Sequence, residues 1–120
     1  MKVPGLEKES GIEVYGTKSN GIGGRLRQFP EDFRVEEILS SGLTAQIEQA
    51  SFPHVDGRGR YLICVLVKRN YDTLLAVQTI ARKQGIDQER IQIAGIKDAR
   101  ALTAQHISIS RMLPEQIPNV

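Results

Sequence analysis

The sequence has 120 residues, of which 40% are hydrophobic and 25% are charged, as in an ordinary globular domain. Sixteen Lys and Arg residues against fourteen Asp and Glu residues leave a net charge of +2, which does not by itself indicate a nucleic-acid partner. No apolar run approaches the roughly 20 residues that a membrane-spanning helix needs, no apolar signal-peptide core follows Met1, and the lone Cys64 excludes an internal disulfide. We therefore expect one cytoplasmic domain that is not embedded in a membrane.

The first third of the chain is rich in glycine and contains two weak phosphate-loop patterns. The segment 11–18 has the glycine spacing of a P-loop, but it ends in Thr17-Lys18 rather than in Lys-Ser or Lys-Thr. The segment 21–24 lacks the third glycine of a dinucleotide fingerprint. Both signals fail, and we expect these glycines to shape a turn that leads into a short strand over 25–29, stopped by Pro30.

The next segments alternate between apolar and polar residues and then lose their regularity. Residues 30–32 have turn chemistry, and 33–39 alternates so that Phe33, Val35 and Ile38 are predicted to face a core. Residues 53–59 are predicted to form a loop. His54 and Asp56 lie in it, which is a weak indication of a catalytic site, and we favour an ordinary loop.

The clearest elements lie in the middle of the chain. Residues 60–68 are almost continuously apolar, as in a central strand. Apolar residues at helical spacing predict a helix over 73–84, with Asp72 as its N-cap and Gly85 as the left-handed residue that ends it. A turn over 88–90 and short strands over 91–93 and 106–110 follow, then a helical turn near Pro114. This order predicts part of a larger sheet domain.

Chemistry is concentrated in residues 94–105, directly after an apolar strand. Asp98 should project from the end of that strand, and the flanking cations Lys97 and Arg100 would keep its carboxylate ionised. Such a carboxylate can act as a nucleophile or a general base. The alternative is an Asp98 that caps a turn beginning at Ala99, with both cations in solvent. No metal-ligand spacing involves His54, His106, Asp98 or Cys64.

Two stretches resemble a known family. Residues 95–105, Gly-Ile-Lys-Asp-Ala-Arg-Ala-Leu-Thr-Ala-Gln, closely resemble the Gly-x-Lys-Asp-x-x-Ala-x-Thr-x-Gln signature of the TruD family of tRNA pseudouridine synthases. Residues 30–38 resemble its Pro-Glu-Asp-Phe-x-Val-x-Glu segment. The resemblance spans roughly 11–117. It implies an α+β fold with a mixed, mainly antiparallel sheet and packed helices, forming part of a pseudouridine-synthase-like catalytic core.

The resemblance also implies a function. The expected enzyme is a cofactor-free isomerase that acts on tRNA, at uridine-13 of the D arm, with Asp98 as catalytic carboxylate. Arg27 matches a basic position that would orient Asp98 or bind phosphate, and Lys97 and Arg100 would support the carboxylate or the RNA. Thr103 and Gln105 match positions that would hold the Asp98 loop in shape.

Length is the main departure from the family. Its members have several hundred residues, with an inserted second domain and a later aromatic motif that stacks on the target base. We therefore expect residues 1–120 to be the N-terminal portion of the catalytic domain, inactive in isolation. The alternatives are a non-catalytic RNA-binding or assembly module and, less favoured, a small metabolic α/β enzyme.

Overall fold

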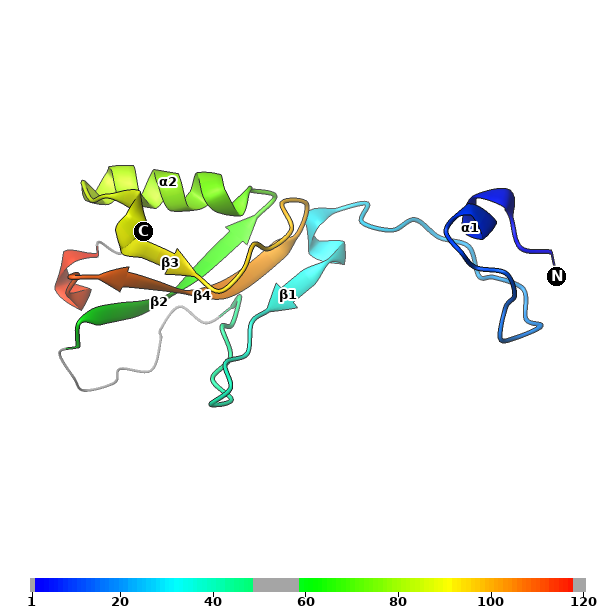
Figure 1. Ribbon diagram of the computed structural model, residues 1–120, viewed down its shortest axis with the longest axis horizontal. Coiled ribbons are helices and arrows are strands. Elements are labelled where there is room, and N and C mark those ends of the chain that lie inside the picture. Colours follow the sequence, from blue (N-terminus) through cyan, green and yellow to red (C-terminus); the bar gives the residue numbers. More distant parts are fainter. Residues whose placement is uncertain (1, 49–58, 118–120) are drawn as a thin grey trace.

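The computed structural model describes residues 2–48 and 59–117, in which one helix packs on one face of a four-stranded sheet (Figure 1). The strands are β1 (Arg34–Glu36), β2 (Tyr61–Arg69), β3 (Ile91–Ile93) and β4 (Leu102–Ser110). The helices are α1 (Gly5–Glu9), η1 (Pro30–Asp32), α2 (Thr73–Gln84), η2 (Gln88–Arg90) and η3 (Pro114–Gln116). The predicted α+β class is confirmed. None of the helices described is long and apolar enough to cross a membrane.

Strand β4 is the centre of the sheet. Strand β2 pairs antiparallel with the whole length of β4, from Leu102 to Ser110. Strands β1 and β3 share the opposite edge: β1 runs parallel to residues 102–104 and β3 antiparallel to residues 107–109. The sheet is therefore mixed but mainly antiparallel, as predicted. Between β1 and β3 the edge of β4 is left without a strand partner at Gln105 and His106.

The core lies between the sheet and helix α2, because alternate residues of β2 and β4 face the helix. The central cluster of buried side chains consists of Val77, Ala81, Ile91, Ile107, Ile109 and Met112. Cys64 of β2 packs against this cluster, and burial raises the pKa of its thiol. That environment suits an inert apolar side chain and disfavours a reactive thiolate.

Helix α2 begins and ends where the sequence predicts. The Asp72 carboxylate accepts a hydrogen bond from the Leu75 N–H at 3.0 Å, which caps the first turn. Gly85 ends the helix with φ +63°, and the Ile86 N–H donates to the Ala81 carbonyl. The cap fixes the position of Thr73, the first residue of the helix, which is fully buried under the loop that carries Asp98.

Three predicted elements differ from the structure. No strand forms over 25–29, because Arg27 adopts a left-handed conformation that an extended strand cannot contain. Strand β1 covers only three residues, and Ile38 is exposed because the alternation of 33–39 turns Phe33, Val35 and Glu37 inward and Ile38 outward. Strand β4 begins at Leu102 rather than at 106, because residues 102–104 pair with both β1 and β2 and Gln105 pairs with β2. The hypothesis about His54 and Asp56 lies outside the described residues.

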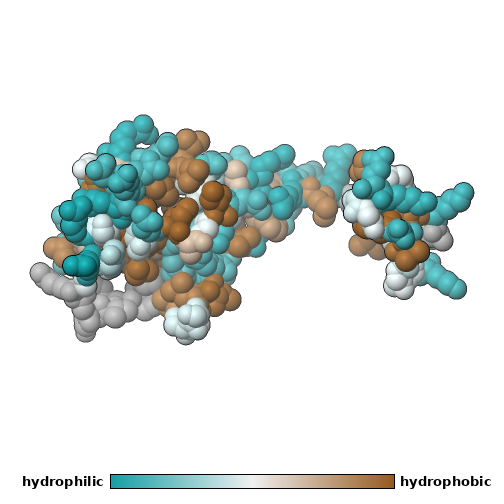
Figure 2. Space-filling model, viewed as in Figure 1, coloured by the Kyte–Doolittle hydropathy of each residue, from teal (hydrophilic) through white to brown (hydrophobic). Residues whose placement is uncertain are grey.

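Residues 2–29 extend from the body as an arm (Figure 1). They stretch the molecule to 60 × 28 × 22 Å and its radius of gyration to 19.5 Å, against about 14 Å for a compact chain of this length. Figure 2 shows apolar side chains on the surface of the arm as well as on the body. Those exposed on the arm include Leu6, Val14, Ile22 and Leu26. Only at its body end, near Arg27, does the arm reach the predicted site.

Candidate active site

Asp98 lies in the loop that connects β3 to β4. Its side chain is half exposed, and its Oδ2 lies 3.4 Å from Nη2 of Arg27. Arg27 comes from the base of the arm, so the tertiary fold brings together two residues that are far apart in the sequence. Because both side chains remain open to solvent, this ion pair contributes little to stability, and its main physical effect is to orient the carboxylate.

Arg27 is held from two sides. Its guanidinium carbon lies 4.2 Å from the centroid of the Phe33 ring, within the range of a cation–π contact. Its backbone has φ +53°, a conformation that costs a non-glycine residue roughly 1 kcal/mol or more. A strained arginine that stacks on an aromatic ring and pairs with a carboxylate is typical of a functional site rather than of a solvated surface.

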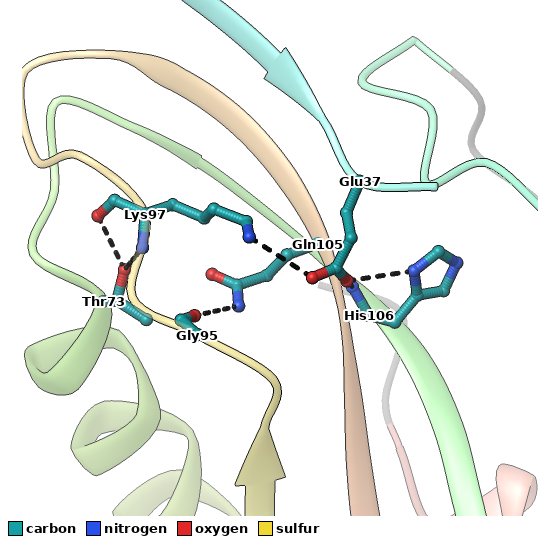
Figure 3. Close-up of polar contacts among 6 residues, drawn as sticks. All are labelled: Glu37, Thr73, Gly95, Lys97, Gln105 and His106. Atoms are coloured by element: carbon teal, nitrogen blue, oxygen red, sulfur yellow. Dashed lines mark hydrogen bonds and ion pairs between the residues drawn. The ribbon is translucent and has the colours of Figure 1, made fainter. Parts of the chain in front are cut away.

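Lys97 does not face Asp98, contrary to the sequence-based expectation that it supports that carboxylate. Its Nζ instead lies 3.3 Å from Oε1 of Glu37, and both side chains are largely buried (Figure 3). The reason is geometric: the loop directs successive side chains apart, so that Asp98 points to solvent while Lys97 points to the edge of β4. The Asp98 turn-cap alternative is also not observed, because no helical turn follows at Ala99.

Glu37 fills the gap in the edge of β4. Strand β1 ends one residue earlier, and the Glu37 carboxylate takes the place of the missing strand (Figure 3). Its Oε2 accepts a hydrogen bond from the His106 backbone N–H at 2.6 Å and lies 3.1 Å from His106 Nδ1. Burial alone would raise the pKa of Glu37, but the hydrogen bonds from His106 and the ion pair with Lys97 outweigh it and hold that pKa below its usual value.

Gln105 and Thr103 lie fully buried on β4, beneath the loop. The Gln105 side-chain Nε2 donates to the Gly95 carbonyl at 3.0 Å and so holds the start of the loop. Thr103 makes no such contact: within the described part of the chain its hydroxyl has no hydrogen-bond partner. Arg100 is exposed, and in the same residues no ion pair or hydrogen bond of its side chain is found. The structure therefore joins Gln105 to the loop, whereas Thr103 and Arg100 stand apart from Asp98.

The unpaired hydroxyl of Thr103 leads to a stability prediction. Thr103→Val is expected to leave the free energy of unfolding unchanged or to raise it by up to about 1 kcal/mol, because a methyl group replaces a buried polar group that forms no bond. Thr73→Val is the matched control: it removes a buried hydroxyl with two partners and should cost about 1–2 kcal/mol. Chemical denaturation of both variants measures the difference. Equal losses would mean that the Thr103 hydroxyl is bonded in solution.

Sequence reasoning missed five residues of the site. Glu37 and Phe33 both belong to the Pro-Glu-Asp-Phe segment, and their place in that motif was a signal that could have found them. Thr73 directly follows a predicted N-cap. Lys68, whose Nζ donates to the Asp98 carbonyl at 2.7 Å, is a cation at the end of an apolar strand. His106 had no signal, because its partner lies 69 residues away in the sequence.

The arrangement offers an exposed, oriented carboxylate on a rigidly held loop. Two surface hollows flank helix α2, and neither includes Asp98. Among the residues described there is also no cluster of three or more His, Cys, Asp and Glu side chains that could hold a metal ion. A half-exposed, oriented carboxylate of this kind suits nucleophilic or general-base chemistry.

Comparisons with known proteins identify relatives of this chain. Proteins described as tRNA pseudouridine synthase D from Methanosarcina acetivorans and Methanosarcina barkeri are 46% and 41% identical, over 91% and 100% of this chain and 22% and 25% of their own length. A crystal structure of the Methanosarcina mazei protein described as tRNA pseudouridine synthase D (TruD) superposes with a TM-score of 0.75 at 39% identity, over 97% of this chain and 24% of that one.

The family model of tRNA pseudouridine synthase D (TruD) matches residues 9–120. The match of the family model and the shared fold thus agree with each other. The chain belongs to the TruD family. It spans about a quarter of the length of the curated relatives that it matches.

Proposed function

We propose that the full-length protein is a tRNA pseudouridine synthase and that Asp98 is its catalytic carboxylate. The family match over residues 9–120 is the observation that carries the proposal. The half-exposed Asp98 carboxylate, oriented by Arg27 on a loop held from several elements, supports it. We further propose that residues 1–120 form the N-terminal portion of the catalytic domain, with the rest of that domain and a second domain supplied by further chain.

The proposed reaction isomerises a uridine within the RNA. The C1′–N1 glycosidic bond breaks, the uracil turns, and C5 bonds to C1′. The hydrogen on C5 leaves as a proton and N1 takes up a proton, so the product is an isomer of the substrate. Asp98 acts either as the nucleophile at C1′ or as the base that removes the 2′ proton, and both roles need an ionised carboxylate. No cofactor enters this scheme.

The partner that we propose is tRNA, in the cytoplasm, with uridine-13 of the D arm as the target by family resemblance. Taking a base out of a helical stack costs a few kcal/mol, so contacts with phosphates must offset that cost. Arg27 is half exposed beside Asp98, and Arg100 is exposed two residues further along the loop. These two arginines can contact phosphate, whereas Lys97 is engaged with Glu37.

The test is product formation by the full-length protein. Transcribed tRNA labelled with tritium at C5 of uridine should release tritium to water in step with the formation of pseudouridine. A tRNA whose uridine-13 is replaced by cytidine should release none above background. Release from the altered tRNA would reject the target while keeping the reaction, and no release from either tRNA would reject the reaction itself.

A second function, a non-catalytic RNA-binding or assembly module, has one observation in its favour. Asp98 is half exposed at the surface, beside the half-exposed Arg27. A module of this kind would bind tRNA with an affinity that falls steeply with salt, since its contacts would be with phosphates. It would release no tritium in the assay above at any salt concentration.

A further inference from the structure

Lys68 is a buried lysine in an apolar setting. It is only 6% exposed, and it follows Leu62, Cys64 and Leu66 on the face of β2 that is turned to the core. Lysine is almost never fully buried unless its charge is paired. In residues 2–48 and 59–117, however, no ion pair joins Lys68 to a carboxylate. A charged side chain at this position therefore needs another explanation.

The Lys68 ammonium binds the main chain of the catalytic loop. Its Nζ donates to the Asp98 carbonyl at 2.7 Å and lies 3.3 Å from the Lys97 carbonyl. Burial lowers the pKa of Lys68, and the negative charges of Asp72 and Asp98 oppose that shift. One buried cation thus holds the two carbonyl groups on either side of the Asp98 backbone.

Thr73 holds the same stretch from the first turn of helix α2 (Figure 3). Its hydroxyl donates to the Lys97 carbonyl at 3.0 Å and accepts from the Lys97 N–H at 3.1 Å. The side chain is fully buried, and Asp72 caps the helix beside it. Because the hydroxyl uses both its donor and its acceptor on one residue, the backbone of Lys97 has little freedom to rotate.

We propose that Lys68 and Thr73 are positioning residues for Asp98, acting by holding the Lys97–Asp98 main chain. This inference rests on the proposed function, since it assigns Asp98 a reaction to be positioned for. Neither side chain reaches the carboxylate; both fix the backbone from which it projects. A displacement of about 1 Å in a reacting group can cost 10²-fold in rate, so the geometry of this loop sets the efficiency of the carboxylate.

The test uses the full-length protein with Lys68→Met, which keeps an unbranched stem and removes the ammonium. We expect kcat for pseudouridine formation to fall about 100-fold, while KM for tRNA stays within about twofold, because the phosphate-binding arginines are unchanged. Lys68→Arg, which keeps the charge and the donors, should recover most of kcat. Lys83→Met, a change of an exposed lysine in the last turn of α2, is the matched control and should behave as wild type.

A second measurement does not depend on activity. Hydrogen exchange of the amides in 96–100 should become at least about tenfold faster in Lys68→Met, with the amides of β2 and β4 unchanged. Unchanged loop exchange would overturn the proposal, and so would an unchanged kcat in an active enzyme. An inactive wild-type protein would instead reject the proposed function, and faster loop exchange would still support the structural part of the inference.

The Thr73→Val variant covers the case in which Lys68→Met does not fold. It removes both contacts with Lys97 without altering the shape of the side chain, so the same two measurements apply. We expect the loop amides to exchange faster and kcat to fall at least about tenfold, with KM retained. A folded Thr73→Val protein with wild-type exchange and kcat would overturn the proposal.

Discussion

In the full-length protein, Asp98→Asn is expected to abolish pseudouridine formation, with a loss of at least about 10⁴-fold in kcat, as found when a group that acts in the chemical step is removed. An amide can neither attack C1′ nor accept the 2′ proton. It keeps the shape of the side chain and an oxygen that can still accept a hydrogen bond from Arg27, so the loop should hold its place. Tritium release from C5-labelled tRNA measures the loss.

The same variant should bind tRNA as tightly as the wild type and unfold at the same denaturant concentration. The Arg27–Asp98 pair is half exposed, and such pairs contribute about 0–1 kcal/mol. Asp87→Asn is the matched control, because Asp87 is exposed and caps its turn without a side-chain hydrogen bond. An Asp98→Asn enzyme that still makes pseudouridine would remove Asp98 from the catalytic role.

The second large effect concerns stability. Glu37→Gln is expected to lower the free energy of unfolding of the sheet by about 2 kcal/mol at neutral pH. The glutamine oxygen can still accept the hydrogen bond from the His106 N–H, but the Lys97 ammonium loses its carboxylate while it stays largely buried. Native-state hydrogen exchange of the β4 amides measures the change locally, at the strand whose His106 N–H binds Glu37.

A double-mutant cycle isolates the ion pair. Lys97→Met alone should also destabilise the sheet, because it leaves the Glu37 carboxylate with only the contacts from His106. Once Glu37→Gln is present, Lys97→Met should cost little or nothing further, giving a coupling energy of about 1 kcal/mol or more. Strictly additive losses would show that Lys97 and Glu37 do not interact in solution.

The pH dependence of Glu37→Gln follows from the pKa of Glu37. That pKa is lower in the folded protein than in the unfolded chain, so the ionised carboxylate stabilises the fold fully above the ordinary glutamate pKa of about 4.3. The contribution is lost as the pH falls through the lower, folded-state pKa. The gap in stability between wild type and Glu37→Gln should therefore be widest at neutral pH and shrink below about pH 4. A gap that is constant with pH would contradict the assignment.

Local sequence signals determined the separate elements of the fold. The apolar run of β2 is read without reference to the rest of the chain, and helix α2 carries both of its end signals, Asp72 and Gly85, within its own segment. The strand β3 and the turn before it were likewise predicted from their own segments. Patterns of this kind depend on residues within about one helical turn or one strand of each other, so the sequence by itself was sufficient for them.

The candidate site could be predicted only in part from the sequence. Its motif placed Asp98 on a loop after a strand, and the structure has that loop. The sequence also suggested that Lys97 supports the Asp98 carboxylate, whereas the structure pairs the Lys97 ammonium with Glu37. The partner of Lys97 is Glu37, whose position depends on where β1 ends against β4. The sequence near residue 97 does not predict that position.

Only the tertiary structure decided what surrounds the carboxylate. Arg27 reaches Asp98 because a left-handed residue turns the base of the arm toward the loop. Lys68 and Thr73 meet the loop because β2 ends and α2 begins directly beneath it. The sequence by itself determined β2, α2 and β3 and singled out Asp98 as the candidate for the chemistry. The contacts that hold and orient that residue join segments far apart in the chain, and such contacts exist only once the sheet has brought its strands into register.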